Sequence, residues 1–184
     1  MKKWIKGNFF VVLIGVLAIG FLFSRYVFNN KICLSPAVSV NSGLQSQVGS
    51  QWSLPDLEGN LFQSRDLDGK VAVLNFWATW CSPCLAEIPS LVYVQETYGP
   101  QGVEVVGISI DHDEEGLRRF VAEKALNYKV VIDDDFSVMS QFVNVRGIPV
   151  TIILDREGRI AKVVPGGISK YRLEQMVLKV LQSS

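Results

Sequence analysis

Histidine and cysteine are scarce in this chain: its 184 residues include one histidine, His112, and three cysteines. A structural zinc site takes four ligands of these two types, so such a small and scattered supply argues against zinc. Acidic residues are absent from the first 30 positions, which hold four of the 18 basic residues. The rest of the chain therefore carries 14 basic against 18 acidic residues. With no basic stripe, a nucleic acid is excluded as a partner.

The long apolar run of the sequence lies near its N-terminus. Three lysines within residues 1–8 precede residues 9–28, which are apolar or small except near the end. No small-x-small cleavage site follows closely, so we predict a retained transmembrane anchor at 9–28 rather than a cleaved signal peptide. By the positive-inside rule, residues 1–8 form a cytoplasmic tail and the rest of the chain lies outside the cytoplasm. Residues 29–47, rich in Asn, Ser, Gln and Gly, are predicted to be a flexible linker, and its Cys33 is assigned no role.

The other two cysteines form a Cys-x-x-Cys motif, Cys81 and Cys84, directly after an apolar run at 71–76 that predicts a buried strand. Two cysteines at this spacing share one face of a first helical turn and can form a disulfide there. Pro83 is compatible with a first turn, where its missing N–H costs nothing. Cys81 then lies at the helix N-terminus, which favours its thiolate, and Cys84 is placed to resolve a mixed disulfide. The motif predicts reversible dithiol/disulfide exchange.

Other interpretations of these residues remain. An inert structural disulfide is one, although closing so short a loop stabilises little. Attachment of a c-type haem is excluded, because it needs histidine directly after the second cysteine and this chain has Leu85. Residues 111–115, Asp-His-Asp-Glu-Glu, could be read as a metal cluster, but a short acidic loop that opens a helix is much commoner. We expect no metal and no cofactor.

Hydrophobic periodicity beyond residue 47 predicts one α/β domain at 48–184, without repeats or a second domain. An N-terminal hairpin is expected first, and strands and helices then alternate as in β-α-β units. The expected strands are 51–53, 60–63, 71–76, 103–110, 130–132, 150–154 and 160–164, and the expected helices are 82–98, which contains Pro89, 114–126, 136–142 and 170–181.

Three stretches together resemble the thioredoxin superfamily: residues 76–84, then Glu87 and Pro89, and later Gly147-Ile148-Pro149. Within it, the chain is most similar to the membrane-anchored TlpA/ResA/CcmG group, over residues from about 48 to the C-terminus. The resemblance implies a thioredoxin fold, in which helices flank a central mixed β-sheet, with an N-terminal β-hairpin and one preceding transmembrane helix.

The resemblance also implies roles for individual residues. Classical thioredoxins carry a buried Asp where this chain has Asn75, whereas ResA-like proteins place a Glu three residues after the second cysteine, which here is Glu87. It implies proton transfer by Glu87, against the alternative of a glutamate that only complements the helix dipole. Pro149 is expected to be cis beside the disulfide, leaving Ile148 to pair with a substrate strand. The expected substrate-binding residues are Trp77, Trp80, Ser82, Pro83, Ile148 and Pro149.

The predicted function is that of an extracytoplasmic thiol-disulfide oxidoreductase anchored by one span in a bacterial cytoplasmic membrane. Pro83 before the second cysteine favours a protein disulfide reductase over an oxidase or isomerase of the same fold. The resemblance implies apocytochrome c as a substrate and a transmembrane thiol electron donor as a partner. A peroxiredoxin-like peroxidase would need Pro-x-x-x-Thr-x-x-Cys around Cys81, and a copper-binding assembly protein would need wider cysteine spacing and a distant histidine. Neither pattern is present.

Overall fold

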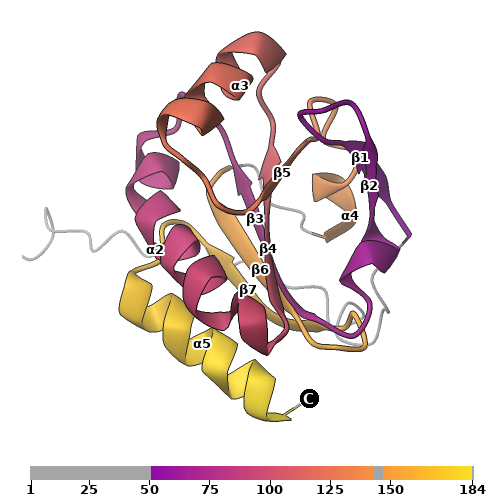
Figure 1. Ribbon diagram of the computed structural model, residues 1–184, viewed down its shortest axis with the longest axis vertical. Helices are drawn as coiled ribbons and strands as arrows, with labels where there is room; N and C mark the ends of the chain where they lie inside the picture. Colours follow the sequence, from indigo (N-terminus) through magenta and orange to yellow (C-terminus); the bar gives the residue numbers. More distant parts are fainter. Residues whose placement is uncertain (1–50, 143–146, 184) are drawn as a thin grey trace, which may run out of the picture. The chain divides into compact units, whose positions relative to one another are not determined.

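The computed structural model describes residues 51–142 and 147–183, which build a five-stranded mixed sheet in the order β5-β4-β3-β6-β7 (Figure 1). Strands β3, β4 and β5 are parallel, and β6 and β7 are antiparallel to their neighbours. Every residue of β3 is buried, because helices and loops cover both faces of the sheet. The strand bounds are β3 (Val71–Trp77), β4 (Val103–Ser109), β5 (Lys129–Ile132), β6 (Val150–Leu154) and β7 (Ile160–Pro165).

Helices α2 (Ser82–Tyr98) and α5 (Lys170–Ser183) pack against each other and against one face of the sheet (Figure 1). Successive side chains of β3 point to opposite faces of the sheet, so their contacts show which helix covers which face. The side chain of Asn75 reaches α2, whereas the ring of Phe76 lies 6.3 Å from that of Phe142 in α4 (Met139–Phe142). Helix α4 therefore covers the face opposite α2.

The predicted N-terminal hairpin is present as β1 (Ser53–Pro55) and β2 (Leu61–Gln63), slightly later than expected. Asp56 holds its turn, because its carboxylate accepts hydrogen bonds from the backbone N–H groups of Glu58 and Asn60 at 2.9 and 2.8 Å. The same carboxylate lies 3.1 Å from the ammonium of Lys129 in β5, which ties the hairpin to the sheet edge. The short helices η2 (Ser64–Leu67) and η3 (Gly99–Gln101) precede β3 and β4.

Two helices are shorter than predicted, for local reasons. Helix α3 (Glu114–Glu123) ends before residue 126, because Ala125 adopts a left-handed φ of 49°. The helix expected over 136–142 begins only at Met139, because Phe136 has a φ of 60°. The buried carboxylate of Asp133 accepts hydrogen bonds from two backbone N–H groups at the start of α4, those of Val138 and Met139. Residues 133–138 therefore form a turn that the side chain of Asp133 stabilises.

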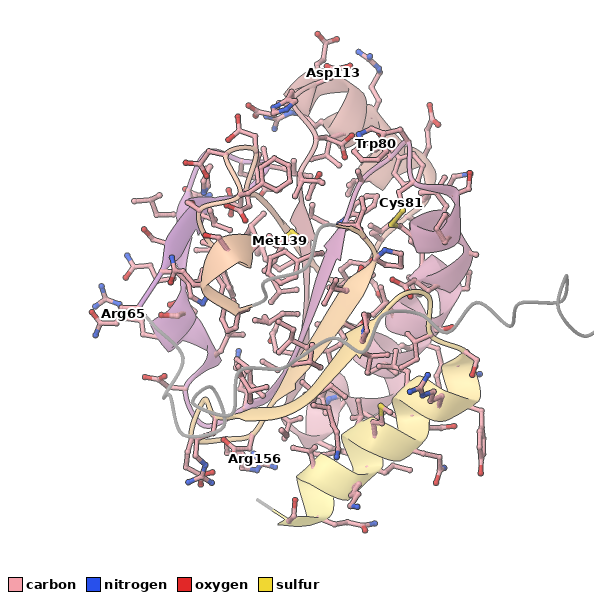
Figure 2. The ribbon with its side chains drawn as sticks, turned by 180° about the vertical axis from the view of Figure 1, so that it is seen from behind. Arg65, Trp80, Cys81, Asp113, Met139 and Arg156 are labelled. Carbon is pink, nitrogen blue, oxygen red and sulfur yellow. A yellow bond between two sulfur atoms is a disulfide. The ribbon has the colours of Figure 1, made fainter. Side chains whose placement is uncertain are left out.

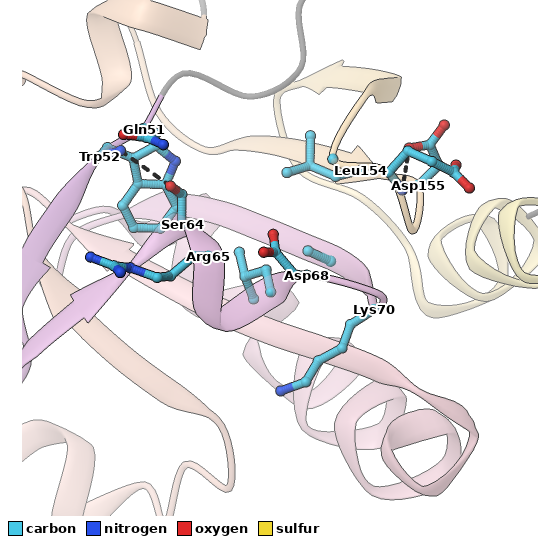
Figure 3. A pocket seen from close by; sticks show the side chains of 12 residues that line it. Gln51, Trp52, Ser64, Arg65, Asp68, Lys70, Leu154 and Asp155 are labelled. Carbon is cyan, nitrogen blue, oxygen red and sulfur yellow. Dashed lines mark hydrogen bonds between the residues drawn. The ribbon is translucent and has the colours of Figure 1, made fainter.

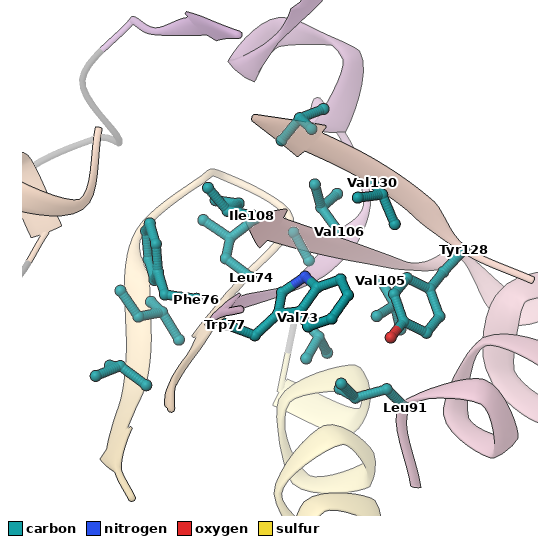
Figure 4. Packing of buried hydrophobic residues seen from close by; sticks show 14 of the residues in the cluster. Val73, Leu74, Phe76, Trp77, Leu91, Val105, Val106, Ile108, Tyr128 and Val130 are labelled. Carbon is teal, nitrogen blue, oxygen red and sulfur yellow. The ribbon is translucent and has the colours of Figure 1, made fainter. Parts of the chain in front are cut away.

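The core lies on both faces of β3, as Figure 4 shows for the side chains around Trp77. Among the described residues, no helix is both long and apolar enough to cross a membrane. The expected cytoplasmic tail at 1–8, the anchor at 9–28 and the linker at 29–47, with Cys33, lie outside the described residues.

Candidate active site

Cys81 and Cys84 form a disulfide at the start of α2, with their Cα atoms 5.3 Å apart. Cys81 is the N-cap residue of the helix, and Pro83 occupies the first turn as the sequence predicted. The Cys81 carbonyl already accepts a helical hydrogen bond from the Leu85 N–H at 3.1 Å. The sulfur of Cys81 therefore lies at the end of α2 where unpaired N–H groups and the helix dipole favour a negative charge. Figure 2 labels Cys81 and its neighbour Trp80 at this end of the helix.

The side chains around the disulfide differ sharply in exposure. Trp80 is 68% exposed, and Ser82 and Pro83 are exposed beside it, so these three form the accessible rim of the motif. Cys84 is fully buried. Trp77 is only 1% exposed, which corrects the expectation that it belongs to the substrate-contacting surface. It is the last residue of β3, and its indole points into the core.

Trp77 instead packs inside the domain. Its ring lies 5.6 Å from that of Phe120 in α3, and Figure 4 shows it beside Tyr128. A Cβ atom on Gly107 would lie 2.9 Å from the Trp77 Nε1 atom and 3.0 Å from Tyr128, so only glycine fits at that position of β4. The Trp77 side chain therefore packs the end of β3, just before the cysteines, against α3 and β4.

Glu87 is 2% exposed and lies three residues after Cys84, on the same face of α2. Its Oε1 atom accepts a hydrogen bond from Asn75 Nδ2 at 2.7 Å, and its Oε2 atom accepts one from the Ile168 N–H at 3.0 Å. The Asn75 amide also donates to Thr151 Oγ1 at 3.1 Å, across the directly paired strands β3 and β6. The carboxyl group is thus fixed by β3, β6 and the segment before α5.

Burial raises the pKa of Glu87 above its ordinary value, although the hydrogen bonds from Asn75 and Ile168 act in the opposite direction. A buried carboxyl group of raised pKa on the same helix face as a buried cysteine is suited to exchange protons with that cysteine, once it is reduced, near neutral pH. Glu87 and Asn75 were both named from the sequence, whereas Thr151, which accepts from Asn75, and Ile168, which donates to Glu87, were missed. The available signal was one polar residue within each of two otherwise apolar strands, Asn75 in β3 and Thr151 in β6.

The Ile148–Pro149 peptide bond is cis, which confirms the expectation from the resemblance. Phe76 pairs with Val150 in the antiparallel β3–β6 ladder, so Pro149 lies at the end of β3 from which the chain continues to Cys81. Pro149 is buried and Ile148 is partly exposed. The Pro149 carbonyl accepts a hydrogen bond from the Gly166 N–H at 2.8 Å, which links this segment to the loop before α5.

The acidic stretch after β4 divides into two parts with different roles. Asp113 caps α3 by accepting a hydrogen bond from the Gly116 N–H at 3.0 Å, in agreement with a loop that opens a helix. Asp111 is instead buried and accepts hydrogen bonds from Thr79 and Ser109. This contact was not predicted from the sequence, and it joins the end of β4 to the segment that carries Cys81.

A recess of about 250 Å³ lies away from the cysteines and is lined in part by Trp52, Arg65, Lys70 and Asp155 (Figure 3). Lys70 immediately precedes β3, and Cys81 lies beyond the other end of this strand. The recess and the disulfide therefore lie at opposite ends of β3. It contributes no residue to the cysteine site.

Comparison with known proteins agrees with this geometry. Residues 47–163 match the AhpC/TSA family. The chain is 36% identical to the thiol-disulfide oxidoreductase ResA of Halalkalibacterium halodurans over 67% of its length and 70% of the relative. It is 29% identical to ResA of Bacillus subtilis, over 87% of this chain and 84% of that one. A crystal structure of a thiol:disulfide interchange protein of the thioredoxin family from Chlorobium tepidum superposes with a TM-score of 0.65 and 29% identity, covering 71% of this chain and 93% of that one.

The matched region includes the strand before the motif, both cysteines, Glu87 and the cis-proline. The chain therefore belongs to the AhpC/TSA family of thioredoxin-fold proteins and is a thiol-disulfide oxidoreductase similar to ResA.

Proposed function

We propose that the chain is a membrane-anchored, extracytoplasmic protein disulfide reductase in which Cys81 attacks the substrate, Cys84 resolves the mixed disulfide and Glu87 exchanges the proton. The observation that carries the proposal is the placement of the two sulfurs. Cys81, which is 6% exposed, is the N-cap residue of α2 and lies next to the exposed rim, whereas Cys84 is fully buried one turn further on, on the helix face that also carries the buried Glu87.

The reaction begins with the reduced pair. The Cys81 thiolate attacks one sulfur of a substrate disulfide, a mixed disulfide forms, and the second substrate sulfur leaves as a thiolate. Cys84 then gives up its proton and attacks the Cys81 sulfur. This step forms the Cys81–Cys84 bond and releases the other substrate thiolate. Two electrons have passed to the substrate, so an external thiol donor must reduce the protein again.

Each site residue has a distinct part in these steps. Glu87 accepts the proton of Cys84 as that sulfur attacks, a role that suits a buried carboxyl group whose pKa burial has raised. Trp80, Ser82 and Pro83 contact the substrate around the disulfide, since they form the accessible rim. Ile148 pairs with the substrate backbone, and the cis-proline Pro149 shapes the surface next to it.

The location and the partners belong to the same proposal, which the N-terminal sequence and the resemblance to ResA-like proteins support. Residues 9–28 anchor the chain in the lipid bilayer of a bacterial cytoplasmic membrane, with residues 1–8 on the cytoplasmic side. A reductase outside the cytoplasm must be recharged through the membrane, so its partner is a transmembrane thiol electron donor. The substrate class is apocytochrome c, whose oxidised Cys-x-x-Cys must be reduced before haem is attached.

The test compares two oxidised peptides with the reduced full-length protein. One peptide carries Cys-x-x-Cys-His, and the other has the same composition with histidine moved away from the cysteines. We expect faster reduction of the first peptide. Equal rates would remove apocytochrome c as the preferred substrate while leaving the reductase in place, and failure to reduce either peptide would contradict the proposed function as a whole. Sodium carbonate extraction of membranes tests the anchor, which should keep the protein in the pellet.

A further inference from the structure

The carboxylate of Asp111 is the centre of a hydrogen-bond cluster at the end of β4. Its Oδ2 atom accepts from the Thr79 N–H at 2.9 Å and from Ser109 Oγ at 2.8 Å, and its Oδ1 atom accepts from Thr79 Oγ1 at 2.7 Å. The Asp111 N–H donates to Ser109 Oγ at 3.1 Å, so the serine hydroxyl both donates to Asp111 and accepts from it. Three donors thus converge on one side chain that is only 5% exposed.

The cluster acts on the segment that carries the attacking cysteine. Thr79 lies two residues before Cys81, in the stretch between the end of β3 and the start of α2. Asp111 fixes both the backbone and the side chain of Thr79. The Cys81 N–H donates to the Ala78 carbonyl at 3.2 Å, so the backbone turn that presents Cys81 includes Thr79 and Trp80. A shift of Thr79 would therefore move Cys81 relative to the N-terminus of α2.

We propose that Asp111 is a positioning residue for Cys81: through Thr79, it holds the attacking sulfur at the N-terminus of α2. This inference rests on the proposed role of Cys81 as the attacking thiol. Asp111 is only 5% exposed, so its effect on the reaction passes through Thr79. Its effect is geometric, because the stabilisation that a helix N-terminus gives a thiolate falls off within the first turn.

The charge of Asp111 and its hydrogen bonds to Thr79 are expected to have opposite effects on the reaction rate of Cys81, so the two effects can be separated. A negative charge near Cys81 disfavours its thiolate, so removing the charge of Asp111 would by itself speed the reaction of Cys81. Loss of the hydrogen bonds to Thr79 would slow it. Three other buried carboxyl groups lie among the described residues, Asp56, Glu87 and Asp133, and each has its own hydrogen-bond donors, so these substitutions leave them in place.

Four variants of the full-length protein test the inference. Asp111→Ala removes the cluster and the charge together, whereas Asp111→Asn removes the charge but can still accept from the Thr79 N–H and donate to the Thr79 hydroxyl. Thr79→Val removes the hydroxyl and keeps the branched shape, and Thr79→Ser restores the hydroxyl. The matched control is Asp113→Ala, two residues away on the same loop, since Asp113 caps α3 and has no hydrogen bond to the cysteine segment.

The readout is the rate at which the reduced protein reacts with iodoacetamide from pH 5 to 9, with the labelled cysteine located by fragmentation mass spectrometry. We expect Asp111→Ala to slow labelling of Cys81 at pH 7 by about tenfold or more, and Thr79→Val by about fivefold, as for loss of one or more hydrogen bonds. Thr79→Ser should restore the rate of Thr79→Val toward that of the wild type, and Asp111→Asn should stay well above Asp111→Ala. Asp113→Ala should leave the rate unchanged.

Thermal melting of each oxidised variant separates positioning from mere stability. A purely structural role would lower the melting temperature of Asp111→Ala while leaving the labelling profile of the folded protein within twofold of wild type, and that result would overturn the inference. Faster labelling in both Asp111 variants would also overturn it, in favour of the charge. If Asp111→Ala does not fold, the two Thr79 variants decide by the same criterion. Preferential labelling of Cys84 in the wild type would instead contradict the proposed function.

Discussion

Replacing Asn75 with leucine should shift the pH dependence of the step in which Cys84 resolves the mixed disulfide. Asn75 Nδ2 donates to Glu87 Oε1 at 2.7 Å and so stabilises the ionised carboxylate against the effect of burial. Leucine branches at the same position but has no donor. Glu87 would then keep only the Ile168 N–H, and its proton would be harder to remove.

The size of the effect follows from the bond that is lost. A hydrogen bond to a charged group contributes about 1.5–3 kcal/mol. Since about 1.4 kcal/mol corresponds to a factor of ten in an equilibrium constant, the ionisation constant of Glu87 should fall about tenfold or more. If Glu87 is the base for Cys84, the resolution rate rises with pH, and the midpoint of that rise should move to higher pH in Asn75→Leu.

Stopped-flow mixing of the reduced protein with an aromatic disulfide reagent measures this step. The first release of the coloured thiolate reports attack by Cys81, and the second reports resolution by Cys84. Thr151→Val is the control, because it removes the second acceptor of Asn75 and leaves the Asn75–Glu87 hydrogen bond in place. A midpoint in Asn75→Leu that is unchanged, or lower than in the wild type, would refute the assignment of Glu87 as the base.

Three further predictions concern separate parts of the molecule. Cys84→Ser should trap substrates as mixed disulfides on Cys81, visible on non-reducing gels, whereas Cys81→Ser should trap none; trapping by the latter would reverse the two roles. Trp80→Ala should change the free energy of unfolding by less than about 0.5 kcal/mol, since the side chain is 68% exposed, and slow reduction of protein disulfides more than that of a small aromatic disulfide. Burial raises the pKa of Asp56, but hydrogen bonds from the backbone and from Lys129 outweigh it and hold the pKa below its usual value. The resulting stability is present above the unfolded pKa and is lost as the pH falls through the folded one, so Asp56→Asn should cost about 1.5 kcal/mol at pH 7 and flatten the acid limb of a urea-unfolding series. An acid limb of unchanged slope would contradict this.

The order of strands and helices could be predicted because the core elements carry strong patterns. The run at 71–77 is fully buried, and the helix that follows begins and ends where the sequence indicated, at Ser82 and Tyr98. The errors lie where a side chain or an unusual backbone angle overrides periodicity. The left-handed conformation of Phe136 and the contacts of Asp133 shorten α4, and neither can be read from a hydrophobic pattern.

The candidate site was predictable in its chemistry but less so in its support. The cysteine spacing is a short local motif, whereas the role of Glu87 and the cis-proline came from the resemblance to a known family. Asp111 and Thr79 are 32 residues apart, and only the parallel pairing of β3 and β4 brings them together. The sequence does hold a signal for this contact, because polar residues directly after neighbouring parallel strands meet at one edge of a sheet. Trp77 was misplaced because the motif does not reveal which of its two tryptophans faces inward. Trp77 is the last residue of a strand that is buried on both faces, whereas Trp80 lies beyond the end of that strand.

The reduction potential of the Cys81–Cys84 pair decides whether the protein can act as a disulfide reductase. The full-length protein carrying Cys33→Ser would be equilibrated in dithiothreitol or glutathione buffers, and the fraction of free thiol would be measured by alkylation and mass spectrometry. Thioredoxin has a reduction potential of about −270 mV, and the strong oxidant DsbA has one of about −120 mV. A potential near or below the first value is the result that a reductase recharged through the membrane predicts. A potential near the second value would contradict the account and make the protein an oxidase or isomerase of disulfides.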